Sequence, residues 1–218
     1  MTELPRTAPP SAIPALPAVD LYGAVHRGLR RELCKLLDRM GTTSLEDAAG
    51  WTSLTTSLEE LLALLEHHFH HEADHLHAAL AQHDAGAAAA LEREHAEHLA
   101  FHAELRTLVR AVHARGEPGT RRALFLRYGA YVGASLVHMT DEELRVQALL
   151  DETCTADELQ ALEQRLLASI PPPVMFAFMC IMLPAQPPEV RAGMLAQART
   201  GMPPQAFAAL TDTLARAA

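Results

Sequence analysis

The amino-acid sequence predicts an all-α fold, an up-down-up-down four-helix bundle with a small C-terminal helical extension. Ala and Leu, two strong helix formers, are abundant among the 218 residues, and aromatic residues make up only 5%. The residue types that favour strands are correspondingly scarce. Four long segments place apolar residues three and four positions apart, the spacing of one helix face. Short connections between such segments favour antiparallel neighbours.

The chain divides into three parts by composition. Residues 1–17 contain five prolines and predict a flexible leader. The bundle is expected over residues 18–167, and residues 168–218 are expected to form a helical extension that packs on it. The bundle's helices are expected at about 19–40, 53–83, 87–114 and 120–150, with a shorter helix at about 155–167.

Two sequence pairs could mark the starts of helices. Ser57 with Glu60 and Thr155 with Glu158 both have the spacing of a capping box. The second helix of the bundle could equally begin near Ser44. In the C-terminal extension, two short helices are expected after the proline pairs at 187–188 and 203–204, because proline suits a first helical turn.

Net charge and cysteine content exclude several classes of protein. The formal net charge of −9 argues against binding to nucleic acid or to an anionic membrane surface. The three cysteines are far apart, so neither a disulfide framework nor a zinc finger is expected. No signal peptide is expected, and the most apolar run, residues 174–183, is shorter than the ~20 residues of a membrane span. These features predict a cytoplasmic protein.

Histidine is the unusual residue. There are 13, and all but His26 lie between His67 and His138. Counted from the helix ends, four helices each place His on the apolar stripe within one layer about 12 Å deep. A core normally excludes such polar groups, so a metal site is the best explanation. The candidate metal ligands in this layer are His26, His68, Glu72, His95, His98, His138 and Glu142.

Two of the helices carry the pattern H-x-x-x-E. His68 with Glu72, and His138 with Glu142, place an imidazole and a carboxylate on one helix face, one turn apart. Such a ligand set is typical of non-haem iron, and a carboxylate can bridge two cations. The alternative, a buried ion-pair network, is costly without a metal.

Four segments together resemble the hemerythrin-like HHE cation-binding family. They are Tyr22-Gly-Ala-Val-His26-Arg-Gly-Leu-Arg30, His68-Phe-His-His-Glu72, Arg93-Glu-His95 and His138-Met-Thr-Asp-Glu142-Glu143-Leu. The resemblance covers about residues 18–167. It implies metal ligation by His26, His68, Glu72, His138 and Glu142 with one His of the third helix, and Glu72 and Glu142 as bridging carboxylates.

The resemblance leaves choices in two helices. In the third helix His95 is favoured and His98 is second, while His102 lies on the same stripe. In the fourth, Glu143 fits the spacing of hemerythrin proper, but helical facing favours Glu142. The remaining histidines, His77 among them, are expected at the surface or around the ligands. Tyr22 is the tyrosine expected nearest to the metals.

The expected cofactor is two iron ions, although manganese with iron, or zinc, would use much the same ligands. An iron pair with His and carboxylate ligands and open positions could bind O2 or peroxide, so the first hypothesis is a protein that activates O2 or peroxide as an oxidoreductase. The extension could then enclose a pocket for a small organic substrate. The alternative is a protein that binds or senses O2, NO or iron without an organic substrate.

Overall fold

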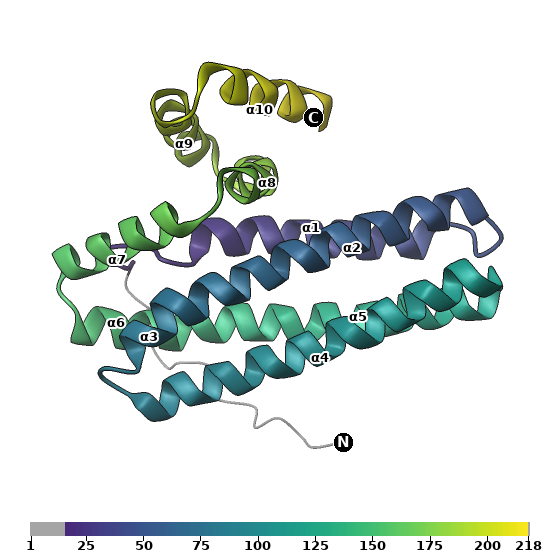
Figure 1. Cartoon of the computed structure of the whole chain (residues 1–218), viewed down its shortest axis with the longest axis horizontal. Helices are drawn as coiled ribbons and strands as arrows, with labels where there is room; N and C mark the ends of the chain where they lie inside the picture. The colour runs from purple at the N-terminus through teal and green to yellow at the C-terminus, as the bar shows by residue number, and fades with distance from the viewer. Residues whose placement is uncertain (1–15, 218) are drawn as a thin grey trace.

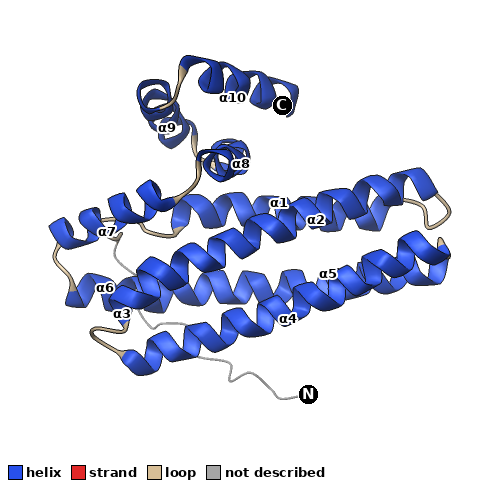
Figure 2. Ribbon diagram, in the orientation of Figure 1, coloured by secondary structure: helices blue, strands red, loops and turns tan. Residues whose placement is uncertain are grey.

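The computed structural model describes residues 16–217, and these are almost wholly helical, with no strand among them (Figure 2). The all-α prediction is therefore confirmed. The α-helices are α1 (Gly23–Thr42), α2 (Ala48–His71), α3 (Ala78–Leu80), α4 (Ala85–Arg115), α5 (Pro118–Asp141), α6 (Gln147–Thr153), α7 (Ala156–Ser169), α8 (Pro172–Met182), α9 (Pro188–Gly201) and α10 (Pro204–Ala217). Two π-helical segments, η1 (Glu72–His77) and η2 (Glu142–Val146), and one 3-10 turn, η3 (Leu183–Ala185), join them. Of the expected leader, only residues 16 and 17 fall within the described residues.

Four long helices lie side by side, and successive ones run in opposite directions (Figure 1). Helix α1 packs on α2 and α5, and α4 packs on the same two helices, so the four surround a common interior. Helices α2 and α5 are each extended by a π-helical segment and a short further helix. Each long helix therefore contributes side chains along most of the interior.

The interior contains two apolar clusters. The larger includes Leu33, Leu62, Leu105 and Tyr131, and the smaller includes Tyr22, Leu76, Leu91 and Val146 among its buried residues. On each long helix the chain passes from one cluster to the other through a short stretch of His and Glu. A polar layer therefore separates the two clusters and is shielded by both.

Caps fix the helix boundaries. Asp47 caps α2 by accepting a hydrogen bond from the Gly50 backbone N–H. The capping box considered for Ser57 and Glu60 is absent, because both residues lie inside α2, about three turns beyond its start. The alternative start near Ser44 is closer to the observed one. The box of Thr155 and Glu158 is present at the start of α7.

The C-terminal helices pack on the side of the bundle formed by α1 and α2, away from α4 and α5 (Figure 1). Gly28 permits this approach, since a Cβ there would lie 3.1 Å from the Ile181 backbone carbonyl. The Gln186 side chain donates a hydrogen bond to the Ala24 carbonyl (2.8 Å). The two short helices predicted at the proline pairs are present. Helix α9 begins at Pro188 and α10 at Pro204, the second proline of each pair.

Among residues 16–217, no single helix is long and apolar enough to cross a membrane. Only Ala156–Ser169 and Pro172–Ala185 taken together satisfy length and composition, and they are bent by 113° where they meet.

Candidate metal centre

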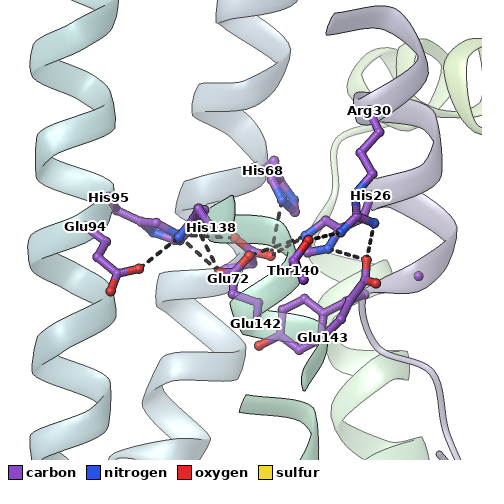
Figure 3. A network of polar contacts seen from close by, with 12 residues as sticks. His26, Arg30, His68, Glu72, Glu94, His95, His138, Thr140, Glu142 and Glu143 are labelled. Atoms are coloured by element: carbon purple, nitrogen blue, oxygen red, sulfur yellow. Dashed lines mark hydrogen bonds and ion pairs between the residues drawn. The ribbon is translucent and has the colours of Figure 1, made fainter. Parts of the chain in front are cut away.

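The polar layer gathers side chains from all four long helices (Figure 3). Helix α1 supplies His26, α2 supplies His68, α4 supplies His95 and α5 supplies His138. Glu72 and Glu142, at the starts of η1 and η2, lie between these histidines. Six of the seven predicted ligands therefore meet in one layer.

Each of the two glutamates faces histidines on both sides. Oε1 of Glu72 lies 3.2 Å from Nε2 of His68 and 3.6 Å from Nε2 of His26, while Oε2 lies 3.5 Å from Nε2 of His95. Oε1 of Glu142 lies 3.3 Å from Nε2 of His138 and 3.5 Å from that of His95, and Oε2 lies 3.5 Å from that of His26. The two oxygens of each carboxylate thus point to different groups of imidazoles, which is the arrangement of a bridging ligand.

The facing atoms lack ordinary partners. All four carboxylate oxygens of Glu72 and Glu142 are buried without a hydrogen-bond partner, and so are Nε2 of His26 and of His68. Buried polar atoms are normally paired, because leaving them unpaired costs free energy. Ligand atoms at about 2.0–2.2 Å from a common metal ion lie roughly 3 Å from one another. The observed separations are close to that value, so the residues fit a metal centre.

Two groups of three buried residues could each hold an ion. One consists of His26, His68 and Glu72, and the other of His77, His95 and Glu142. In the second group, His138 is also close, since its Nε2 lies 3.1 Å from Nε2 of His95. The layer therefore offers two adjacent positions with different numbers of imidazoles.

His77 corrects the sequence analysis, which expected this residue at the surface or around the ligands. It is 1% exposed, and neither ring nitrogen has a hydrogen-bond partner in the described chain. The π-helical segment η1 runs from Glu72 to His77 and accommodates one more residue per turn than an α-helix. A residue five positions after Glu72 consequently returns to the same interior face. π-Helical segments occur frequently at functional sites, and this one begins at a candidate ligand.

The geometry of α4 favours His95. The ring of His98 lies beside that of His138, with centroids 4.8 Å apart, but His98 belongs to neither of the two groups that could hold an ion, and no ion pair joins it to Glu72 or Glu142. His102 is occupied elsewhere, because it pairs with the Tyr131 hydroxyl (2.6 Å) and with Glu66 (3.1 Å). The described geometry thus brings His95 to the two glutamates and leaves His98 next to the site.

Two further carboxylates hold the outer nitrogens of ligand histidines. Nδ1 of His26 donates to Glu143 (2.9 Å), which Arg30 also contacts, and Nδ1 of His138 donates to Glu94 (3.0 Å). Such bonds fix the orientation of the ring and leave Nε2 free for a metal. Glu143 therefore accepts a hydrogen bond from His26 at the edge of the layer. Glu142 faces the interior, as helical facing predicts.

Electrostatics favour neutral imidazoles in part of the layer. Burial lowers the pKa of His77 to about 4 and that of His98 to about 3, and it holds the pKa of His68 well below its usual value. Neutral imidazole is the form that binds metals. Burial and the charge of Glu142 raise the pKa of Glu72. Burial also acts to raise the pKa of Glu142, but His95, His138 and His26 outweigh it and hold that pKa below its usual range. Glu72 therefore needs further positive charge beside it to remain ionised.

Tyr22 lies one helical turn before His26, and its hydroxyl is buried without a partner. Burial raises the pKa of this phenol well above its usual value, and the charges of Glu142 and Glu72 raise it further. The hydroxyl is thus kept protonated close to the two glutamates, as the sequence position suggests.

The geometry agrees with what is found by comparison with known proteins. A family model described as the hemerythrin HHE cation binding domain matches residues 18–150. This range contains every residue of the polar layer, whereas α7, α8, α9 and α10 lie outside it. No curated protein and no solved structure matches the chain.

Proposed function

The chain belongs to the hemerythrin HHE cation-binding family, and on that premise we propose that it holds two iron ions and activates O2 or peroxide as an oxidoreductase. The observation that supports this most directly is the pair of buried glutamates, whose four oxygens lack partners and face imidazoles on both sides. Manganese with iron, or two zinc ions, would use much the same donor atoms. The identity and number of the ions are part of the proposal.

The proposed ligands are divided unequally between the two ions. His26 and His68 would bind one ion, and His77, His95 and His138 the other, with Glu72 and Glu142 shared. Counting both bridges, the first ion has four protein ligands and the second has five. Octahedral iron would retain at least one open position at each ion, and bound iron would supply redox chemistry with O2 or peroxide there.

The chain's own residues would control water and protons at the site. The two apolar clusters exclude bulk water from above and below the layer. Glu143 and Glu94 keep a proton on the outer nitrogens of His26 and His138. The Tyr22 hydroxyl, which is buried near the glutamates, could donate a proton within the site.

A second candidate function is reversible binding or sensing of O2, NO or iron without an organic substrate. The same ligand set is compatible with reversible binding or sensing, because one fold can support different functions. A cavity beside the ligands, described below, favours an enzyme. Mixing the reduced, iron-loaded protein with O2 separates the two functions. A carrier would return to its starting spectrum when O2 is removed, whereas an oxidase would stay oxidised and consume O2.

Metal analysis of protein purified without added metal tests the core of the proposal. We expect about two iron ions per chain in the unaltered protein. A His68→Ala variant should lose metal and stability, because metal binding adds to the free energy of folding. His70→Ala is the matched control, since His70 is exposed on the same helix. A folded but metal-free chain would contradict the proposal, and two metals in the His68→Ala variant would contradict the ligand assignment.

A further inference from the structure

A cavity of about 600 Å³ lies between the bundle and the C-terminal helices. Residues of α1, α2 and η1 line one side, and residues of α7, α8 and α9 line the other. Its size is within the range of pockets that enclose small organic molecules. The family match ends at residue 150, so α7, α8 and α9 are contributed by the part of the chain that lies outside it.

The cavity reaches the metal centre on one side only. His68 and Glu72 line it, whereas none of His77, His95 and His138 does. A molecule in the cavity would therefore approach the ion held by His26 and His68. This is the ion with fewer proposed protein ligands.

The wall of the cavity is chiefly apolar and rich in methionine. Five methionines line it: Met175, Met179, Met182, Met194 and Met202. Methionine is unbranched and polarisable, so a surface built from it adapts to apolar ligands of varied shape. Such a wall stabilises a hydrocarbon chain or ring by burial.

The charges around the cavity are negative. Asp20, Glu72 and Glu163 line it, and among residues 16–217 no Lys or Arg does. Burial and the charge of Asp20 raise the pKa of Glu163, which shows that additional negative charge is unfavourable there. Away from the proposed metal ions, an anionic group would have no cationic side chain to pair with. His71 also lines the cavity, and its buried Nε2 has no hydrogen-bond partner, so it can bond to an uncharged polar group.

From these contacts we propose that this methionine-lined cavity binds a largely apolar organic molecule, with its polar end at His68 and Glu72. The inference deepens the proposed function and rests on it, because the molecule would be the organic substrate of the oxidoreductase. It identifies the C-terminal helices as the part of the chain that selects the substrate.

Two glycines of α9 provide a matched pair of variants. A Cβ added at Gly201 or at Gly193 meets no atom within 4 Å, so both positions have space for one. Gly201 lines the cavity and Gly193 does not. Gly201→Phe should therefore fill part of the cavity, while Gly193→Phe adds the same side chain to the same helix outside it.

The test uses the full chain loaded with cobalt(II), and 1-decanol as the probe. Calorimetry should detect saturable binding of decanol. Decanol should also shift the visible spectrum of the bound cobalt, since its end lies at two of the ligands. Gly201→Phe should weaken decanol binding roughly tenfold or more, and Gly193→Phe should leave it unchanged.

Two results would overturn the inference: no binding of decanol, or equal decanol affinity in the two variants. Metal content distinguishes this failure from failure of the proposed function. Two irons per chain with no binding of decanol leaves the metal centre intact and removes the substrate assignment. Binding of decanol to a chain that takes up neither iron nor cobalt would leave the cavity assignment intact and remove the metal centre.

Discussion

The hydrogen bond between His26 and Glu143 offers a direct test of how the metal centre is held. The His26 ring is fully buried, with Nδ1 2.9 Å from Glu143 Oε1 and Nε2 facing Glu72 and Glu142. In a Glu143→Ala variant, the Nδ1–H group loses its acceptor and the ring is no longer held in one orientation. Metal affinity should fall as a result, while the set of ligands remains complete.

The size of the effect follows from the exposure of Glu143. Loss of a carboxylate that orients a ligand histidine typically lowers metal affinity by about 10- to 100-fold. The Glu143 side chain is 32% exposed, so water can partly replace it. We therefore expect a loss of about tenfold, which corresponds to about 1.4 kcal/mol. A Glu143→Gln variant keeps an acceptor oxygen but not the charge, and we expect a smaller loss of about threefold.

The measurement is an anaerobic titration of the metal-free protein with iron(II) in competition with a coloured chelator. Glu92→Ala is the control, because Glu92 is exposed on α4. Its affinity should equal that of the unaltered chain. If Glu143→Ala also binds both ions with unaltered affinity, the orienting role inferred from the 2.9 Å contact is refuted.

Three other outcomes are expected. His77→Ala should weaken binding of one iron by at least roughly tenfold in the same titration, whereas His70→Ala, at an exposed position, should not. In the metal-free protein, burial lowers the pKa of His26, but Glu143 and Glu72 outweigh burial and raise it from 6.5 to about 9. Protonated His26 therefore stabilises the folded state fully below pH 6.5, and this stabilisation is lost as pH rises through 9. The free energy of unfolding of the metal-free protein, measured with urea, should be lower at about pH 9.5 than at about pH 6.5. Gly28→Ala should lower the free energy of unfolding by about 1 kcal/mol, because the added Cβ crowds the α8 backbone, while Gly133→Ala, which points into open space, should raise it by up to about 1 kcal/mol.

Most of the metal layer could be predicted because α-helical periodicity governs most of the long helices. His26, His68 and Glu72 follow the three- and four-residue spacing, and the structure brings them together. The preference for Glu142 over Glu143 likewise follows from helical facing and agrees with the observed burial.

Features that depend on irregular backbone or distant contacts could not be predicted. His77 is five residues after Glu72, and an α-helix would turn it away from the interior. The sequence contains no signal for a π-helical segment, although both segments begin at the Glu of an H-x-x-x-E pair. The packing of α8 against α1 depends on Gly28 and Gln186, whose partners are more than 150 residues distant in the sequence.

The π-helical segment η1 also determines how an extra residue is accommodated within a long helix of the bundle. Each residue of an α-helix advances the side chains by about 100° around the axis. Removing Ala73 and letting η1 relax to α-helical geometry would place His77 four positions after Glu72, which is again the interior face. The half-helix that follows would then keep its phase and its contacts with the smaller cluster, whereas an α-helix that kept all the residues would turn both by about 100°. A further insertion or deletion should therefore be accepted in the turn after α3 far more readily than between the candidate ligands, where one residue determines which side chains face the polar layer.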